Sequence, residues 1–182
     1  MQFNSLEFAV FLPIVFIIYW FVVRENLKAQ NILLLAASYF FYGWWDWRFL
    51  ILLVLLSVTN YFIGSGLSRY REKKAGKVLL ITGLVINIGA LAFFKYFNFF
   101  IDSFIDLVSL TGYELARITL KVILPLGISF YIFLSISYLV DIYKKEIEPE
   151  KSFFEVLLTL SFFPIILAGP IHRPKTLLPQ IK

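Results

Sequence analysis

Residues 49–68 of the chain have the sequence FLILLVLLSVTNYFIGSGLS, which contains no charged side chain. An α-helix needs about 20 largely apolar residues to cross the ~30 Å hydrocarbon core of a membrane, and this stretch has that length. Backbone hydrogen bonds must close within the segment there, because hydrocarbon offers no water as a partner. The stretch therefore predicts a transmembrane helix.

Five further uncharged runs accompany this stretch, at residues 8–23, 29–45, 78–94, 122–140 and 156–171. None shows the alternation of polar and apolar residues that barrel strands have. Pro164 and then Gly169-Pro170 interrupt the last run, which predicts a broken or partly re-entrant helix there. We therefore expect an all-α, polytopic helical membrane protein with about six transmembrane or re-entrant helices. Residues 1–182 would form part of a single multi-span domain.

The composition excludes the other broad classes of protein. Hydrophobic residues make up 60% of the 182 residues and charged residues 16%, and the mean hydropathy is +0.82. Soluble domains have roughly 45–50% hydrophobic and 25% charged residues. A soluble domain of this size has too large a surface relative to its volume to bury the additional apolar side chains. A disordered or collagen-like chain would be less apolar or richer in glycine. The absence of cysteine rules out disulfides, thiolate catalysis and cysteine-ligated metal centres.

The distribution of basic residues predicts the orientation. No Lys or Arg precedes the first apolar run, whereas Arg24 and Lys28 follow it, so we expect a retained anchor with the N-terminus outside. The connections at 24–28, 69–77 and 141–155 carry ten basic residues, against six on the other side, where Lys95 at the end of a span is not counted. The stretch RYREKKAGK at 69–77 is typical of a cytoplasmic anchor near anionic lipid, and no nucleic acid partner is expected.

Residues 95–109 have a different pattern. Lys95, Asn98, Asp102, Asp106 and Ser109 recur at spacings of three and four, with aromatic and aliphatic residues between them. This spacing places the polar side chains on one face of a helix. The helix would lie along the outer membrane surface or, alternatively, extend the fourth span; the amphipathic pattern favours the interfacial position.

Aromatic residues gather at the ends of spans that we expect to face outward. They close the second and fourth runs and begin the fifth, around Trp44, Phe97 and Tyr131. An interfacial aromatic belt explains them, and the alternative is a groove that handles a chain or a sugar. Asp46 and Arg48 flank Trp47, where an ion pair that fixes the turn is a better explanation than catalysis.

His172 is the only histidine, and Pro170 and Pro174 bracket it. An isolated imidazole can act as a general base near neutral pH. However, no acid at a fixed spacing, nucleophile motif, phosphate-binding loop or zinc motif accompanies it. A structural or interfacial role is therefore favoured, and His172 stays a weak catalytic candidate. No metal site is expected.

The order of the motifs resembles the membrane-bound O-acyltransferase family, and within it the alginate O-acetyltransferase branch. The resemblance rests on NSLEF at 4–8, SYFFYGWWDWRFL at 38–50, NYFIG at 60–64, KYFNF at 95–99, LPLGISFY at 124–131, SYLVDIY at 137–143, SFFP at 161–164 and AGPI at 168–171. It covers the whole chain. A D-alanyl-transferring sister branch fits less well, because the turn at Gly43-Trp44-Trp45-Asp46 is similar to the alginate group.

The resemblance implies an acyltransferase of the bacterial cytoplasmic membrane that O-acetylates an exported or cell-wall polysaccharide. It implies an acyl-thioester donor, such as acetyl-CoA or an acyl carrier, with no bound cofactor. It also implies a funnel through the bilayer and an extracytoplasmic acetyltransferase partner. Candidate residues for the outer-face groove or funnel lining are Trp44, Trp45, Asp46, Trp47, Arg48, Lys95, Tyr131 and Arg173.

The family's characteristic histidine lies in a later span, beyond residue 182. We therefore expect an N-terminal portion of such an enzyme, inactive by itself, and do not transfer the catalytic role to His172. The alternatives are a membrane scaffold or accessory subunit that is not an enzyme, and a small transporter. A transporter is disfavoured because the spans lack the paired intramembrane charges of a polar pathway.

Overall fold

The computed structural model describes residues 5–110, 122–168 and 173–181, and every regular element in these ranges is a helix. The elements are α1 (Leu6–Ile17), which continues into the π-helical turn η1 (Ile18–Val22), then α2 (Leu27–Trp45), α3 (Trp47–Tyr70), α4 (Lys74–Ser109), α5 (Ile128–Tyr143), α6 (Phe153–Ser161), α7 (Phe163–Ala168) and α8 (Pro174–Ile181). The predicted all-α class is confirmed. Within the described part, α3 and α4 are long and apolar enough to cross a membrane, so the count of six spans is not confirmed.

Polar side chains set the helix starts where the sequence leaves an apolar run. Ser5 Oγ accepts from Phe8 N at 3.2 Å at the start of α1, and Asn26 Oδ1 accepts from Ala29 N at 3.1 Å at the start of α2. Ser152 Oγ accepts from Glu155 N at 3.4 Å in front of α6. Each bond satisfies one of the amides that the first helical turn leaves without a partner.

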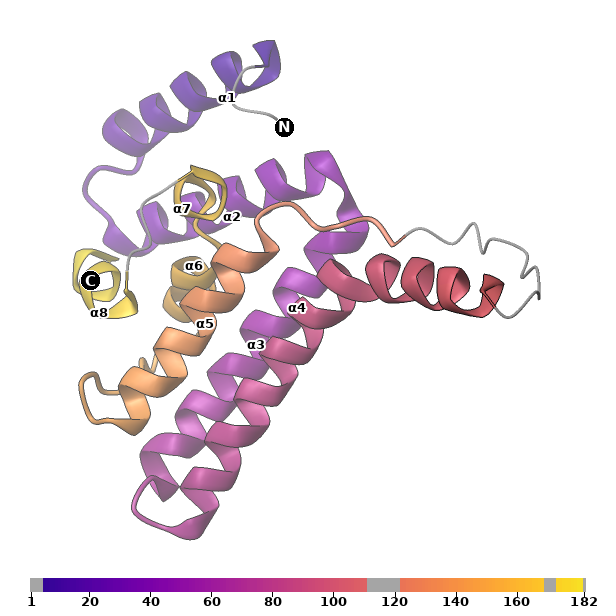
Figure 1. Cartoon of the computed structure of the whole chain (residues 1–182). Coiled ribbons are helices and arrows are strands. Elements are labelled where there is room, and N and C mark those ends of the chain that lie inside the picture. The colour runs from indigo at the N-terminus through magenta and orange to yellow at the C-terminus, as the bar shows by residue number, and fades with distance from the viewer. Residues whose placement is uncertain (1–4, 111–121, 169–172, 182) are drawn as a thin grey trace.

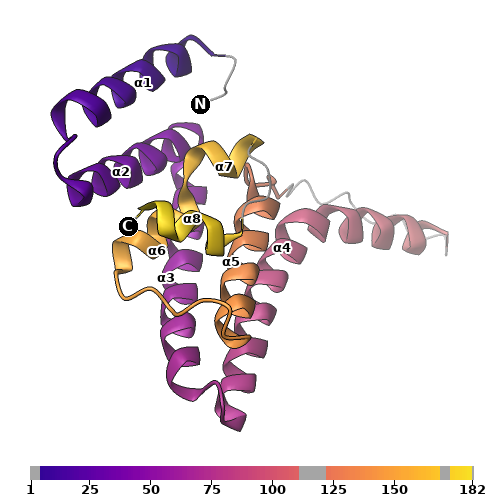
Figure 2. The ribbon, with the colours of Figure 1, turned by 90° about the vertical axis from the view of Figure 1, so that its left-hand side faces the viewer.

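Helices α3, α4 and α5 pack side by side and form the long part of the molecule (Figure 1). The antiparallel pair α1 and α2 lies across one end of this bundle, as both Figure 1 and Figure 2 show. Helices α6, α7 and α8 fill the space beside α2 and α5. The core is therefore divided into several apolar clusters; one of them joins α1, α2 and α7 through Phe11, Phe41 and Phe163.

The amphipathic segment at 95–109 is helical and continuous with the fourth apolar run, because both belong to α4. The end of α4 nonetheless changes direction and projects sideways from the bundle (Figures 1 and 2). Both faces of this part carry exposed side chains: Phe100 (65%) and Phe104 (59%) on the apolar face, and Asp102 and Asp106 on the polar face. The sequence allowed two positions for residues 95–109: an extension of the fourth span, or a separate helix at its outer end. The structure combines the two, because these residues continue α4 but turn away from its axis.

The fifth and sixth runs differ from simple spans. Residues 122–127 are not helical, because Pro125 and the left-handed Gly127 (φ 69°) precede the helix, which begins at Ile128. In the sixth run the helix stops at Ser161, and Phe162 is extended (φ −61°, ψ 109°). Pro164 then sits in the first turn of α7, where its missing N–H is tolerated. The predicted break is confirmed.

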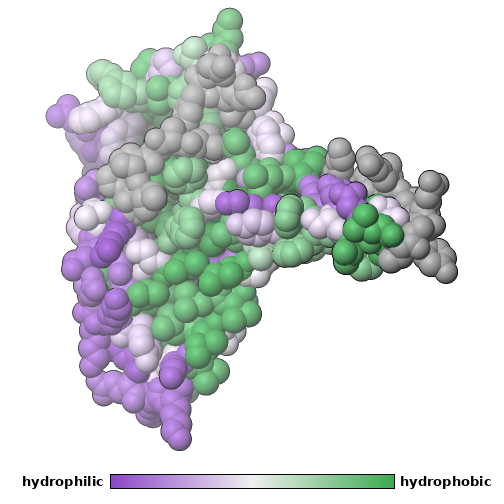
Figure 3. Space-filling view, in the orientation of Figure 1, coloured by the Kyte–Doolittle hydropathy of each residue, from purple (hydrophilic) through white to green (hydrophobic). Residues whose placement is uncertain are grey.

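Two connections that the charge pattern assigned to the same side meet in the structure. Arg71 Nη2 lies 3.1 Å from Glu148 Oε1, and Lys145 Nζ is paired with Glu72. In Figure 3 hydrophilic residues cover the lower tip and the left side of the molecule, whereas the flank of the bundle to their right is strongly hydrophobic. Because these ion pairs join the 69–77 loop to the 144–151 loop, they support the prediction that both loops lie on the same side of a membrane.

Candidate functional site at the aromatic end

A single residue, Asp46, separates α2 from α3. Its backbone is extended (φ −160°, ψ 113°), and its Oδ1 accepts from Arg48 N at 2.9 Å, which caps α3. The Arg48 guanidinium donates to the same carboxylate through Nε at 3.0 Å and Nη2 at 2.7 Å. This hydrogen-bonded guanidinium lowers the pKa of Asp46. The expected ion pair is therefore present and fixes the turn.

The three tryptophans around this turn face three different surroundings. Trp45 points inward, and its ring stacks on Phe49 with centroids 5.4 Å apart. Trp44 is 57% exposed and lies beside Phe40, on the side of α2 that faces α1. Trp47 is 66% exposed. The structure therefore does not gather the predicted tryptophans into one groove.

A small pocket does form next to the turn, between α3, α4 and the segment before α5. It has a volume of about 280 Å³ and is lined by Arg48, Phe49, Phe93, Phe94, Val122 and Ile123. The Phe49 and Phe94 rings meet edge to face at 5.9 Å and form its inner wall. Apolar walls with one charged group at the rim are typical of binding pockets. Of the predicted residues, only Arg48 lines this pocket.

Asn98 holds the segment before α5 against α4. Its Nδ2 donates to Val122 O at 2.8 Å, and its Oδ1 accepts from Val122 N at 2.9 Å. One side chain thus satisfies both backbone polar groups of Val122, which has no helical partners for them. Lys95, one turn earlier, is exposed, and its ammonium lies 5.6 Å from the centre of the Tyr96 ring. Lys95 therefore adjoins the pocket region without lining it.

Tyr131 is a core residue and not a surface one. It is 1% exposed and packs in an apolar cluster with Tyr42, Leu53 and Ile166. Its hydroxyl interacts with the Tyr42 hydroxyl but forms no close hydrogen bond among the described residues. Tyr42, which the sequence analysis did not single out, donates its hydroxyl to Leu126 O at 2.8 Å and so ties α2 to the start of α5.

Gly127 allows α7 to approach this cluster. Its φ of 69° is a left-handed conformation, and a Cβ there would lie 2.6 Å from Ile166 O. Glycine is the residue that adopts this conformation without steric cost. The LPLG stretch is therefore a turn built to place α7 against α5, next to Tyr131.

Arg173 lies apart from the aromatic turn. It precedes α8, which packs on α5 and α6, and its backbone carbonyl accepts from Thr176 N at 2.9 Å. Lys175 Nζ lies 3.6 Å from Glu146 Oε2, in the connection expected on the opposite side of the membrane. Among the described residues Arg173 is therefore placed with α8, beside α5 and α6, and not beside Trp44; its place in a groove or funnel lining stays a prediction. His172 lies outside the described residues.

The chemistry available in the described ranges is that of binding. No group of three or more His, Cys, Asp or Glu side chains within residues 5–110, 122–168 and 173–181 is arranged to hold a metal ion. The aromatic end offers apolar walls and the Arg48–Asp46 pair at its rim. These groups can orient an apolar or amphiphilic molecule. The all-helical fold, with two helices in the described part long and apolar enough to cross a membrane, is consistent with a helical membrane protein.

Comparison with known proteins is consistent with this class and narrows it. The chain is 38% identical to the probable alginate O-acetylase AlgI of Pseudomonas putida, an alignment that covers 99% of this chain and 37% of that protein. It is 36% identical to the same-named protein of Pseudomonas aeruginosa, in an alignment that covers 99% of this chain and 34% of that protein. The peptidoglycan O-acetyltransferase of Helicobacter pylori is 34% identical, covering 94% and 37%. No family model matches, and no solved structure gives a significant match.

These relatives confirm the resemblance that the motifs indicated, to the alginate O-acetylase branch of the membrane-bound O-acyltransferases. The similarity extends over nearly the whole chain. The chain spans about a third of the length of the curated relatives that it matches.

Proposed function

We propose that this chain forms part of a membrane O-acyltransferase that O-acetylates an exported or cell-wall polysaccharide. The observation that carries the proposal is 38% identity over 99% of the chain to a probable alginate O-acetylase. Similarity to a peptidoglycan O-acetyltransferase at 34% identity supports a polysaccharide acceptor in general, without selecting one. The donor would be an acyl thioester, and an extracytoplasmic acetyltransferase would receive the acetyl group.

We assign a structural and binding role to this segment. The aromatic end and the basic loop lie at opposite ends of α3, whose 24 residues span about 36 Å at 1.5 Å per residue. That length exceeds the ~30 Å hydrocarbon core, so one end would reach each membrane surface. With the basic 69–77 loop in the cytoplasm, the Asp46 turn and the pocket at Arg48 would face outward, where an exported polysaccharide passes.

The catalytic histidine implied by the family would lie in a part of the relatives that this chain does not span. A decisive experiment compares O-acetyl content of the exported polysaccharide in a deletion strain complemented with the full-length gene, with the His172→Ala variant, or with residues 1–182 alone. We expect full and His172→Ala genes to restore acetylation and residues 1–182 to fail. Loss of acetylation in the His172→Ala strain, with normal protein level, would refute this assignment.

A second experiment, with purified protein, separates an enzyme from an accessory subunit. Purified full-length protein is given a radiolabelled acyl-thioester donor, and label transfer to an acceptor is followed. We expect transfer that depends on the full-length protein. Restored acetylation in cells without any transfer by the purified protein and its extracytoplasmic partner would instead identify a scaffold.

A further inference from the structure

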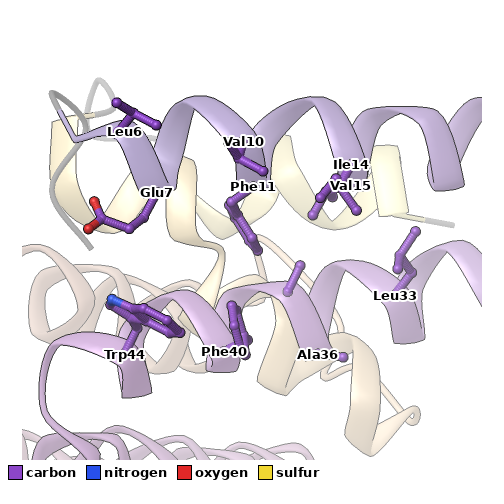
Figure 4. Close-up of a pocket in the computed structure, with 11 residues that line it drawn as sticks. Leu6, Glu7, Val10, Phe11, Ile14, Val15, Leu33, Ala36, Phe40 and Trp44 are labelled. Carbon is purple, nitrogen blue, oxygen red and sulfur yellow. The ribbon is translucent and has the colours of Figure 1, made fainter.

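Two cavities differ in the material of their walls. The groove between α1 and α2, of about 720 Å³, is lined only by these two helices (Figure 4). The pocket beside Arg48 is smaller, about 280 Å³, and Val122 and Ile123 form one of its walls. These two residues belong to a non-helical connecting segment, residues 122–127, which leads into α5 (Figure 1). The shape of this pocket therefore depends on what holds the connecting segment.

Side-chain hydrogen bonds fix the connecting segment at two points. Asn98 on α4 bonds both backbone polar groups of Val122, at 2.8 and 2.9 Å. Tyr42 on α2 donates its hydroxyl to Leu126 O at 2.8 Å, near the other end of the segment. The connecting segment is therefore held between two helices, by one side chain from each.

Between these two points the connecting segment is weakly held. The N–H and C=O groups of Ile123 and Leu124 form no hydrogen bond among the described residues. Their side chains are 53% and 50% exposed, so packing contributes little there. Ile123 directly follows Val122 and lies three residues before Leu126. Its place in the pocket wall is therefore set mainly by the bonds that Asn98 makes.

We propose that Asn98 is a positioning residue for the pocket beside Arg48: it fixes the pocket wall at Val122, and O-acetylation depends on that wall. The proposal rests on the proposed function, in which this pocket faces outward. A carboxamide carries a donor and an acceptor side by side, so one asparagine can bond both the N–H and the C=O of one residue. The competing role for Asn98 is stabilisation of the fold alone.

The first measurement reports on the connecting segment itself and needs no activity. Residues 1–182 contain no cysteine, so Leu124→Cys can carry a nitroxide spin label in the full-length protein once any later cysteine is replaced. Leu124 is exposed and does not line the pocket. When Asn98→Ala is added, the ratio of mobile to immobile label should rise about tenfold or more, because two hydrogen bonds are lost. An unchanged spectrum would overturn the hold of Asn98 on the segment.

Asn98→Asp gives a signature that a general loss of stability does not. An ionised aspartate accepts from Val122 N but has no proton for Val122 O, whereas a protonated aspartate supplies one. The label in Asn98→Asp should therefore be mobile above about pH 7 and immobile below about pH 4. The wild type and Asn98→Ala should each keep one ratio over this range. A label in Asn98→Asp whose mobility does not fall with pH would overturn the assigned pairing.

The wild type also controls for other titrating groups. The charged groups near this position are common to all three proteins: Lys95, Asp102, Asp46 and Arg48. A change that one of them caused would appear in the wild type and in Asn98→Ala as well. A pH response confined to Asn98→Asp therefore belongs to the new carboxyl group.

The second measurement is the O-acetyl content of the exported polysaccharide in cells complemented with the full-length gene. Asn98→Ala should lower it severalfold at a normal protein level. Asn31→Ala is the matched control, because Asn31 Nδ2 also donates to a backbone carbonyl, Ile181 O at 2.8 Å, and does not line the pocket. It should leave acetylation at the wild-type level. Equal losses in the two variants would assign Asn98 a structural role alone and overturn the proposal.

The two measurements fail in different ways. A label that becomes mobile in Asn98→Ala while acetylation stays at the wild-type level would overturn the dependence of acetylation on this wall. A wild-type gene that restores no acetylation in the deletion strain would refute the proposed function, and with it any role of Asn98 in acetylation. The spin label would then still decide whether Asn98 holds the connecting segment.

Discussion

The side-chain amides of Asn60 and Asn87 form two reciprocal hydrogen bonds, of 3.2 and 2.9 Å, between α3 and α4. Each amide donates its other N–H to a carbonyl of its own helix, at Leu56 O (2.7 Å) and Gly83 O (2.8 Å). All four amide N–H bonds are therefore used, although neither residue has exposed surface. Such a closed polar pair in apolar surroundings fixes the register of two helices.

Replacing either asparagine by leucine should destabilise the protein, because the remaining amide loses its partner while still buried. We expect a loss of about 1–3 kcal/mol in the free energy of unfolding for Asn87→Leu. In a double-mutant cycle with Asn60→Leu, the coupling energy should be about 0.6–1.7 kcal/mol. Equilibrium unfolding in detergent measures both quantities.

Thr59→Ala is the matched control for this pair. Thr59 neighbours Asn60 on α3 and bonds only to Leu55 O of its own helix, at 2.8 Å. It should change the unfolding free energy little. Additive effects of the two asparagine variants would show that the pair does not couple α3 to α4.

Gly127→Ala should destabilise the junction between α5 and α7. Its φ of 69° disfavours a side chain, and the new Cβ would lie 2.6 Å from Ile166 O. A strained residue of this kind costs about 1–3 kcal/mol. Gly89→Ala in α4 is the control, because no atom lies within 4 Å of its Cβ position. In thermal unfolding the Gly127→Ala variant should have a clearly lower melting temperature than the Gly89→Ala variant. Equal melting temperatures would show that the left-handed turn at Gly127 does not require glycine.

The Tyr42 and Tyr131 hydroxyls should respond oppositely to removal. Tyr42→Phe loses the 2.8 Å bond to Leu126 O and should cost about 1 kcal/mol of stability. Tyr131→Phe removes a buried hydroxyl that forms no close hydrogen bond among the described residues, and it should be neutral or stabilising. If Tyr131 serves the proposed function, its variant should also lower O-acetyl content in complemented cells. A destabilised Tyr131→Phe protein would show that its hydroxyl has a structural partner.

Asp46 should make stability depend on pH at the acidic end. Its pKa is lowered in the folded state, chiefly by the hydrogen bond from Arg48. The stabilisation is therefore complete above the ordinary Asp pKa of about 3.9 and is lost as the pH falls through the lower folded value. Melting temperatures of the wild type and Asp46→Asn should differ at pH 7 and converge below about pH 4. A difference in melting temperature that persists below about pH 4 would show that Asp46 stabilises the protein by capping α3 and not through its charge.

Orientation is tested by thiol labelling in intact cells. A cysteine at the exposed Ala75, in the basic loop, should resist an impermeant reagent until the membrane is opened. A cysteine at Leu110, 83% exposed at the end of α4, should react from outside. The ion pairs that Arg71 and Lys145 make between the two basic connections predict the same behaviour for both loops. Labelling of the Ala75 variant in intact cells would reverse the topology.

Local features were predictable because their causes are local. The uncharged run at 49–68 gives α3, Pro164 breaks the sixth run, and the Asp46–Arg48 pair follows from two residues of opposite charge beside one turn. The polar spacing after Lys95 gives a helix. None of these inferences needed contacts between distant segments.

The candidate site was predicted less well, because its members come from distant segments. Trp44, Trp45 and Trp47 are adjacent in sequence but point in different directions on their helices. Tyr131 looked like an outer aromatic residue and is instead buried against α2 and α7. The hydrogen bonds from Asn98 to Val122 and from Tyr42 to Leu126 join different elements. Sequence spacing does not predict such contacts between distant residues.

The sequence by itself determined that the chain is helical and apolar and that its basic residues are concentrated in a few connections, above all at 69–77. It also indicated which family of acyltransferases the chain resembles. Hydropathy, helix caps and charge counts are sums over neighbouring residues, so they need no fold. Only the tertiary structure decided that α4 bends away from the bundle, that α8 turns back to Glu146, and that α1 and α2 leave a groove between them. These depend on which side chains meet across helices, and that is set by packing and by bonds such as the Asn60–Asn87 pair.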